Sequence, residues 1–254
     1  MNPFTTTIPK LENVTEKYKF ISTAQFIEDV TSLGYKLEST RQPRRGLGMH
    51  SMAFSHSSLP KLQGIDLRLL ATNSHDATSA FRLHIQVGVN VCANILTAFV
   101  PELAASARIV HRGYALDKVA NAVDAVRNRI DYVINTMQKM QSHNPTSAQG
   151  SKFIHQASEL RDAKPFRILD LQRVQHNEQA DNTAWNIFNR VQESIIKGGY
   201  ETIELAQYDI PRYNIVKGMQ IPGRKAREMT SIRELVQTNY KLWELAVETL
   251  IKDN

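Results

Sequence analysis

Among the residues of types suited to nucleophilic or acid–base chemistry, His75, Asp76 and Cys92 are the candidates around which an enzyme site could be built. Such chemistry needs a nucleophile and a base within hydrogen-bond reach of each other. His75 and Asp76 are adjacent, so their side chains point apart in a strand or a helix. Cys92 is the only cysteine, and its ordinary role is that of a small buried hydrophobe. An enzyme that uses these three residues is an alternative that the sequence leaves open, whereas its patterns favour a protein that is not an enzyme.

Metal and nucleotide motifs have little support in the sequence. His155 and Glu159 are four residues apart and can share a helix face, but no third ligand follows at a spacing typical of zinc sites. The sequence contains no G-x-S-x-G, no G-x-x-x-x-G-K and no G-x-G-x-x-G after a strand pattern. We therefore expect neither a metal ion nor a cofactor.

Positive charge is concentrated in two segments of a chain whose net charge is +6. Residues 39–101 contain six basic and two acidic side chains, and residues 211–227 contain five basic and no acidic ones. Localised positive charge attracts polyanions, because each neutralised phosphate releases a condensed counterion. The side chains that we expect to contact phosphates are Arg41, Arg44, Arg45 and Arg82 in the first segment, and Arg224, Lys225 and Arg227 in the second.

This charge pattern predicts a nucleic-acid partner, with single-stranded DNA binding or annealing in recombination or replication as the favoured role. The prediction requires the two basic segments to meet on one face of the folded chain. An acidic protein surface fits the same pattern and is the alternative. DNA or RNA, single or double strand, sequence preference and oligomeric state are left open, and a homo-oligomer is compatible with the sequence.

The composition predicts a soluble, intracellular protein, with 42% hydrophobic and 22% charged residues among 254. No apolar run reaches the roughly 18–20 residues of a membrane span, and Met1–Lys10 lacks the pattern of a signal peptide. The single cysteine excludes a disulfide framework. We therefore expect no membrane partner.

The first half of the chain has the alternating patterns of β-strands. The clearest is Phe81–Val91, where apolar residues alternate with polar ones over eleven positions. We expect His84, on its polar face, to be exposed. Segment 72–79 is predicted to be a turn that the side chains of Asn73 and Asp76 close. The other predicted strands are Tyr35–Thr40, Met49–Ser57 and Ile65–Ala71, with the basic connection Gln42–Gly48 between the first two.

Helical patterns flank these strands and dominate the second half. Ser22 and Gln25 form a capping-box pattern at the start of a short helix that ends at Gly34. One apolar stripe predicts a single long helix over Asp117–Gln141. The remaining predictions are helices at Cys92–Leu103, Thr183–Lys197 and Ser231–Leu250, a linker at Ser142–Gly150 and a loop over residues 211–227.

This order of elements favours an α+β fold over an alternating α/β fold. We expect an antiparallel sheet with an N-terminal helix and a long crossing helix, followed by a mainly helical C-terminal half. The predicted parts are an α+β part at residues 1–141 and a mainly helical part at residues 151–254, which can pack into one domain.

Three blocks of residues carry recognisable motifs in a fixed order. They are Ser74, His75, Asp76, Arg82, Cys92 and Asn94 in the first block, Trp185, Asn189, Glu193 and Gly198 in the second, and Asn239, Leu242 and Trp243 in the third. These blocks resemble a known family, domain of unknown function family 932, which phages and plasmids encode. Its members carry a serine–histidine–aspartate–glycine run, an arginine-bearing strand and a cysteine–x–asparagine. Here Ala77 replaces the glycine of the first motif.

The resemblance implies a phage or plasmid origin and a location in the host cytoplasm, and it supplies no established activity. A protein partner would then be a host or phage protein. A fold-level analogy links the predicted order of elements to single-strand annealing proteins of the phage Red-beta type, in which basic hairpins on a sheet backed by a helix line a DNA groove.

Overall fold

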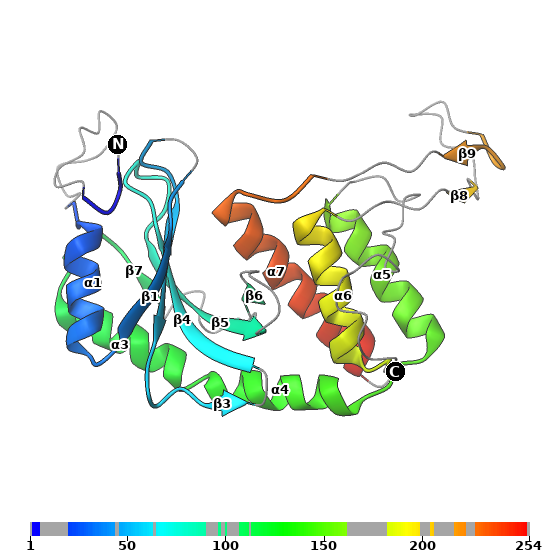
Figure 1. Cartoon of the computed structure of the whole chain (residues 1–254), viewed down its shortest axis with the longest axis horizontal. Coiled ribbons are helices and arrows are strands. Elements are labelled where there is room, and N and C mark those ends of the chain that lie inside the picture. The colour runs from blue at the N-terminus through cyan, green and yellow to red at the C-terminus, as the bar shows by residue number, and fades with distance from the viewer. Residues whose placement is uncertain are drawn as a thin grey trace. The chain divides into compact units, whose positions relative to one another are not determined.

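The computed structural model describes the chain over a set of separate ranges (Figure 1). These are residues 2–5, 20–43, 46–62, 65–89, 96–97, 100, 107–111, 113–161, 182–198, 204–205, 216–221 and 227–252. Two compact units contain them. Unit 1 comprises Met1–Val133 with Ser231–Val236, and unit 2 comprises Ile134–Thr230 with Gln237–Asn254. The predicted division into residues 1–141 and 151–254 stays a prediction.

Unit 1 is built on an antiparallel sheet. Its main path has the order β1-β2-β4-β5-β6, and the short strands β3 and β7 pair with β4 and β5. The strands are β1 (Lys36–Arg41), β2 (His50–Ser55), β3 (Lys61–Leu62), β4 (Ile65–Asn73), β5 (Phe81–Val89), β6 (Leu96–Thr97) and β7 (Arg108–Ile109). The four predicted strands correspond to β1, β2, β4 and β5, and the α+β prediction is confirmed.

The apolar face of this sheet forms the core of unit 1. Alternation along β5 places Phe81 and Leu83 on that face, where both are buried. Helices α1 (Thr23–Ser32) and α3 (Leu116–Arg127) lie on the same side of the sheet (Figure 1). The ring of Phe26 in α1 stacks on that of Phe81, with centroids 4.2 Å apart. The expected cap of α1 is confirmed, because Ser22 Oγ accepts from the backbone of Gln25 at 3.0 Å.

The predicted long helix over 117–141 is wrong in one respect, because it is broken into α3 and α4 (Ile130–Ser142). Asn128, a poor helix former, ends α3, and Arg129 N donates to Val126 O only three residues back, at 3.1 Å. Val126 and Ile130 are buried on either side of the break. The apolar stripe therefore continues across the break, so the sequence pattern does not reveal that the helix is interrupted.

Three further predictions of elements need correction. Leu96–Thr97, expected in a helix, pairs with Val87 and Gln86 of β5, so that sheet pairing overrides local helix propensity. The predicted loop over 211–227 contains β9 (Gln220–Ile221), which pairs with β8 (Glu204–Leu205). Helix α5 (Ser147–Arg161) begins inside the predicted linker. Thr146 and Gln149 cap it reciprocally, with Gln149 N donating to Thr146 Oγ1 at 3.2 Å and Thr146 N donating to Gln149 Oε1 at 2.8 Å.

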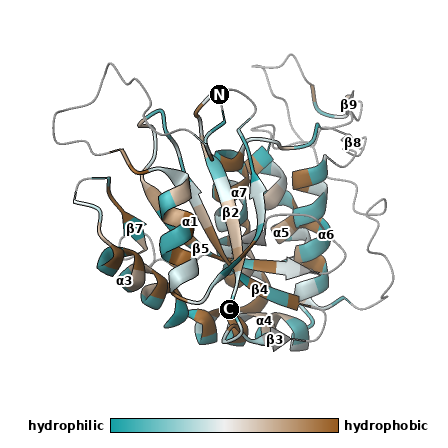
Figure 2. Cartoon of the chain, turned by 60° about the vertical axis from the view of Figure 1, so that its left-hand side comes forward, coloured by the Kyte–Doolittle hydropathy of each residue, from teal (hydrophilic) through white to brown (hydrophobic). Residues whose placement is uncertain are grey.

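Unit 2 is mainly helical. It contains α5, α6 (Ala184–Lys197) and most of α7 (Ile232–Ala246), which continues as a π-helical segment, η3 (Val247–Ile251). Bands of apolar and hydrophilic residues follow one another along α6, as expected for an amphipathic helix (Figure 2). Its core is aromatic, with the Phe188 ring 5.8 Å from Trp243 and nearly perpendicular to it. The predicted end of α6 is confirmed, since Gly198 has a φ of 81°. Over the ranges described above, no helix is long and apolar enough to cross a membrane.

Candidate nucleic-acid interface

A row of paired residues crosses the sheet of unit 1 near one end. Arg41 pairs with Ser51, Ser51 with Thr72, Thr72 with Arg82, and Arg82 with Arg108. Side chains of directly paired residues point to the same face of a sheet, so all five share one face. Neighbouring strands lie about 4.8 Å apart, which places Arg41 about 14 Å from Arg82. We call Arg41, Arg82 and Arg108 the arginine row.

The guanidinium groups of the arginine row concentrate positive charge at this end of the sheet. Arg108 is exposed, and Arg41 and Arg82 are half-buried. Neither Arg41 nor Arg108 forms an ion pair with any residue that the structure describes. Arg82 and Arg108 are directly opposite, and like charges in that position destabilise a strand pair.

A fourth arginine belongs to unit 1 through the first residues of α7. Arg233 Nη2 donates to the backbone oxygen of Thr78 at 3.3 Å, in the turn between β4 and β5. Sequence reasoning missed both Arg108 and Arg233, because they lie in segments where acidic residues balance or outnumber the basic ones. Arg108 joins the arginine row through strand pairing, and Arg233 reaches the turn because the first residues of α7 lie beside it.

The turn between β4 and β5 is held by its own side chains. Ser74 Oγ accepts from Ser79 N at 2.8 Å, and Asp76 Oδ1 accepts from Thr78 Oγ1 at 2.6 Å and from Thr78 N at 3.1 Å. Partial burial raises the pKa of Asp76, but the hydrogen bonds from Thr78 outweigh it and lower the pKa below its ordinary value. The predicted role of Asp76 in closing the turn is confirmed.

The same prediction is wrong for Asn73. This residue is the last of β4, and its Oδ1 lies 3.2 Å from His111 Nε2 in the buried interior. Because β4 extends two residues beyond its predicted end at Ala71, Asn73 belongs to the sheet and the turn begins after it.

Ala77 adopts a left-handed backbone conformation, with a φ of 59°. It is the only residue other than glycine with a positive φ in the part of the chain that the structure describes. In an L-residue the Cβ atom makes this conformation unfavourable by about 1–2 kcal/mol. The family pattern has glycine at this position, and the turn geometry explains why.

We expect Ala77→Gly to stabilise unit 1 by about 0.5–1 kcal/mol, since relief of the Cβ strain exceeds the entropy that glycine gains in the unfolded chain. Urea unfolding of the two proteins measures the difference. Ala80→Gly, in the same connection but without a positive φ, is the matched control and should not stabilise. Equal or lower stability of Ala77→Gly would contradict the assigned turn conformation.

His75 lies away from the carboxylate of its neighbour. It is fully buried, and its Nε2 is 2.8 Å from Thr23 Oγ1 and 3.0 Å from Pro3 O. The oxygens of Asp76 are engaged by Thr78 instead, and no hydrogen bond joins His75 to Asp76. Burial lowers the pKa of His75. Cys92, the third residue of the catalytic alternative, is outside the described residues, so that alternative stays a prediction.

His84 contradicts the expectation that it is exposed. Only 4% of its surface is accessible, and its Nε2 lies 3.0 Å from Thr72 Oγ1 on the adjacent strand. Burial, with a smaller contribution from the charge of Arg82, lowers its pKa to about 3. The polar face of β5 is therefore largely covered at this position. Alternation in the sequence reveals the two faces of a strand but not which of them is covered.

The second family block has structural roles in α6. Trp185 is buried, with its ring 5.9 Å from that of Phe188. Asn189 Nδ2 donates to Trp185 O at 2.8 Å, and Glu193 pairs with Lys197 at 2.9 Å. These contacts stabilise the helix and its packing.

The third block meets the second inside unit 2. Gln192 Nε2 of α6 donates to Asn239 Oδ1 of α7 at 3.1 Å, and both residues are buried. A buried amide pair of this kind fixes the register of two helices, because any shift would leave a polar group unsatisfied. We conclude that the shared positions of the two blocks build the helical core.

Several predicted site residues are outside the described residues. They are Arg44, Arg45, Cys92, Asn94, Arg224 and Lys225. Arg227 is described, is exposed, and belongs to unit 2, whereas Arg41 and Arg82 belong to unit 1. The convergence of the two basic segments stays a prediction.

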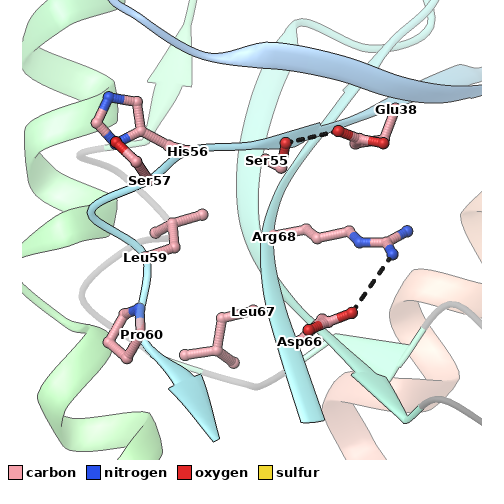
Figure 3. Close-up of a pocket in the computed structure, with 9 residues that line it drawn as sticks. All are labelled: Glu38, Ser55, His56, Ser57, Leu59, Pro60, Asp66, Leu67 and Arg68. Carbon is pink, nitrogen blue, oxygen red and sulfur yellow. Dashed lines mark hydrogen bonds and ion pairs between the residues drawn. The ribbon is translucent and has the colours of Figure 1, made fainter.

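A pocket with a volume of about 340 Å³ opens where the sheet is interrupted (Figure 3). Strand β2 ends at Ser55, and β3 begins at Lys61, so the intervening loop leaves room beside β4. Its lining residues are Glu38, Ser55, His56, Ser57, Leu59, Pro60, Asp66, Leu67 and Arg68. Ser55 Oγ donates to Glu38 Oε1 at 2.7 Å, and Arg68 Nη2 lies 3.8 Å from Asp66 Oδ2. With two carboxylates against one guanidinium, this pocket disfavours phosphate and is separate from the arginine row.

No cluster of three metal-ligating side chains occurs over the ranges that the structure describes. His155 and Glu159 do share a face of α5, with His155 Nε2 and Glu159 Oε1 3.7 Å apart. Two ligands on an exposed helix are too few for a structural metal site.

Comparison with known proteins places the chain in a family. The family model described as Domain of unknown function (DUF932) matches residues 10–243. The chain belongs to the DUF932 family. Proteins of similar sequence include UPF0380 protein YfjQ of Escherichia coli (strain K12), which is 23% identical over 254 residues that cover 95% of this chain and 85% of that protein. UPF0380 protein YafZ of the same strain is 23% identical over 200 residues, which cover 75% of this chain and 72% of its own. No solved structure matches the chain.

All three blocks that carry the resemblance lie within the DUF932 match. In the first block, Ser74 and Asp76 form the turn, His75 is buried, and Arg82 belongs to the arginine row. The other two blocks form the core of unit 2. For this DUF932 member, the described motif residues other than Arg82 therefore act through packing and turn geometry.

Proposed function

We propose that this protein binds nucleic acid, with single-stranded DNA as the favoured ligand, through the arginine row of unit 1. The observation that carries the proposal is the register that aligns Arg41, Arg82 and Arg108 on one face. Arginine side chains are common phosphate contacts in protein–DNA complexes because their planar donors match phosphate oxygens.

The geometry favours an extended polyanion over a single small anion. The row spans at least the roughly 14 Å between Arg41 and Arg82, which exceeds what one phosphate group can bridge. Arg233, which contacts the turn beside β5, adds a fourth positive charge. The residues between the arginines in the row are Ser51 and Thr72, which are neutral and buried, so phosphates would contact the arginine side chains and not these two residues.

The finer role is annealing or protection of single strands during recombination or replication, in the host cytoplasm of a phage or plasmid. Support for it comes from the family resemblance and from the fold-level analogy to annealing proteins, which share an antiparallel sheet backed by helices. The sequence-based expectation that Arg44, Arg45, Arg224, Lys225 and Arg227 also contact phosphates stays a prediction.

Fluorescence anisotropy with a labelled single strand of about 20 nucleotides tests the proposal. We expect a Kd below about 10 μM at low salt and weaker binding at moderate salt, because counterion release drives association. Duplex and RNA of the same length and sequence identify the preferred nucleic acid. Absence of binding to all three at low salt would refute the proposal.

Capture from host lysate treated with nuclease distinguishes the alternative of a host or phage protein partner. A protein bound directly to the basic surface survives nuclease treatment, whereas one bridged by nucleic acid is lost. Substitution of the arginine row must abolish the capture before that partner is assigned to the same surface.

A further inference from the structure

Two buried histidines and a threonine form a hydrogen-bonded chain at the same end of the sheet, on its apolar face. Thr23 Oγ1, at the start of α1, lies 2.8 Å from His50 Nε2 and 2.8 Å from His75 Nε2. All three residues are fully buried, and the two imidazole rings are 4.8 Å apart. The proposed interface with nucleic acid does not use these groups.

The contacts fix where each proton lies. Pro3 O can only accept, so His75 Nε2, at 3.0 Å, carries a hydrogen and donates. Thr23 Oγ1 and Pro3 O share this one hydrogen of His75 as acceptors, and Thr23 gives its single hydroxyl hydrogen to His50 Nε2. His50 therefore carries its hydrogen on Nδ1, which faces Gly48 O at 3.2 Å. Both rings are neutral in this arrangement, and each proton of the chain has an acceptor.

Protonation breaks this arrangement at both rings. A proton added to His50 Nε2 leaves the hydroxyl hydrogen of Thr23 without its acceptor. A proton added to His75 enters at Nδ1, a buried atom that has no hydrogen-bond partner within the described part of the chain. Burying a donor without an acceptor costs about 1–3 kcal/mol, and burying a charge costs more.

These side chains hold two segments against the sheet. Pro3 O binds His75, and the Phe4 ring packs edge-on against His50 at 5.4 Å, so residues 2–5 depend on both rings. His75 N donates to Leu47 O at 2.8 Å, and the bond from His50 to Gly48 anchors the same connection between β1 and β2. That connection is the one in which the sequence carries Arg44 and Arg45.

We propose that Thr23, His50 and His75 form an acid-sensitive latch, which releases residues 2–5 and the β1–β2 connection from the sheet when the histidines are protonated. The latch does not depend on the proposed binding of nucleic acid, because it is inferred from the contacts of Thr23, His50 and His75.

The surroundings of both rings keep them neutral in the closed latch. Burial is the main cause that lowers the pKa of His50 to about 4, and the neighbouring His75 lowers it further. Asp76 is the acidic group that acts on both rings, and it raises both pKa values without offsetting burial. The remaining titratable neighbour among the described residues is His111, which reaches the cluster through Asn73. Residues 2–5 contain no titratable side chain.

Hydrogen exchange of the full chain at pH 7.0 and pH 5.0 tests the latch. The readout is the protection factor, which corrects for the intrinsic pH dependence of exchange, of the amide of His75 and of the peptide containing residues 2–5. Linkage at His50 alone predicts that the opening equilibrium rises about 20-fold over this interval. Protection in α6 should stay constant. Equal protection of the His75 amide at both pH values would overturn the proposal.

Paired variants separate protonation from other effects of acid. His50→Gln with His75→Gln keeps amide groups near the ring nitrogens but cannot be protonated, and should lose the pH effect. His155→Gln, on the exposed face of α5, should retain it. Should the double variant fail to fold, a side-chain NMR titration of the wild-type protein decides. Titration of both rings near pH 6.5 without loss of protection would then refute the latch.

Discussion

Lowering the pH from 7 to 4.5 is expected to reduce the free energy of unfolding by up to about 5 kcal/mol, through His50 and His84. The two rings are buried on opposite faces of the sheet, with pKa values of about 4 and about 3. Both are close to 6.5 when the chain is unfolded. The native state therefore resists a proton that the unfolded state accepts.

The sign follows from these lowered pKa values. Well above pH 6.5 both histidines are neutral in the native and in the unfolded state, so they do not reduce the free energy of unfolding. As the pH falls below 6.5 the unfolded state takes up protons first, so each ring removes up to about 1.4 kcal/mol per pH unit until its native pKa is reached. When the latch opens, His50 can be protonated without global unfolding of the chain. His50 can then lower the free energy of unfolding by no more than the free energy of latch opening.

Urea unfolding at several pH values between 7 and 4.5 measures this loss, provided that the dependence on denaturant is unchanged. His84→Gln should remove about half of the pH dependence, and the exposed His155→Gln should remove none. A stability that is constant from pH 7 to pH 5 would contradict the burial of both rings.

Substituting the whole arginine row, as Arg41→Ala with Arg82→Ala and Arg108→Ala, is expected to weaken binding of single-stranded DNA about 100-fold at low salt. Each contact between a guanidinium group and phosphate at a partly solvated site contributes about 1 kcal/mol, and contacts to separate phosphates add. Anisotropy with the labelled strand measures the change.

A control variant removes three positive charges elsewhere in unit 1, so that its net charge equals that of the arginine-row variant. Lys36→Ala with Lys118→Ala and Arg127→Ala serves this purpose, since all three side chains are exposed and none belongs to the row. We expect it to lose less than about 5-fold, through the general field alone. Equal losses in the two variants would mean that only total charge matters.

Much of the fold follows from the periodicity of the sequence. Alternation at 81–91 predicts β5 and its apolar face, and the patterns at Ser22 and Gly198 predict the ends of α1 and α6. Local patterns fail where tertiary pairing decides. Leu96 and Thr97 have no strand pattern of their own, and they become a strand only because β5 offers them partners.

The candidate site is less predictable than the fold, because it depends on register. The sequence identifies Arg41 and Arg82 as members of a basic segment, but nothing in it aligns them through Ser51 and Thr72. Arg108 joins them from a distant two-residue strand. The burial of His84 is similarly hidden, since alternation does not reveal what covers the polar face.

The turn after β4 illustrates how the family pattern and physical reasoning combine. The resemblance expects glycine at position 77, and the positive φ of Ala77 supplies the reason. The adjacent His75 is buried among Thr23 and Pro3, a role that no local pattern indicates. Residues close together in the sequence therefore serve the turn and the buried latch separately.

The salt dependence of single-stranded DNA binding, compared between the wild-type protein and the arginine-row variant, tests the central claim most directly. Each phosphate contact contributes about −0.7 to the slope of log K against log salt, so three lost contacts should reduce its magnitude by about 2. The control variant should keep the wild-type slope. An arginine-row variant with the wild-type slope would show that these side chains do not contact phosphates, and the proposed interface would be wrong.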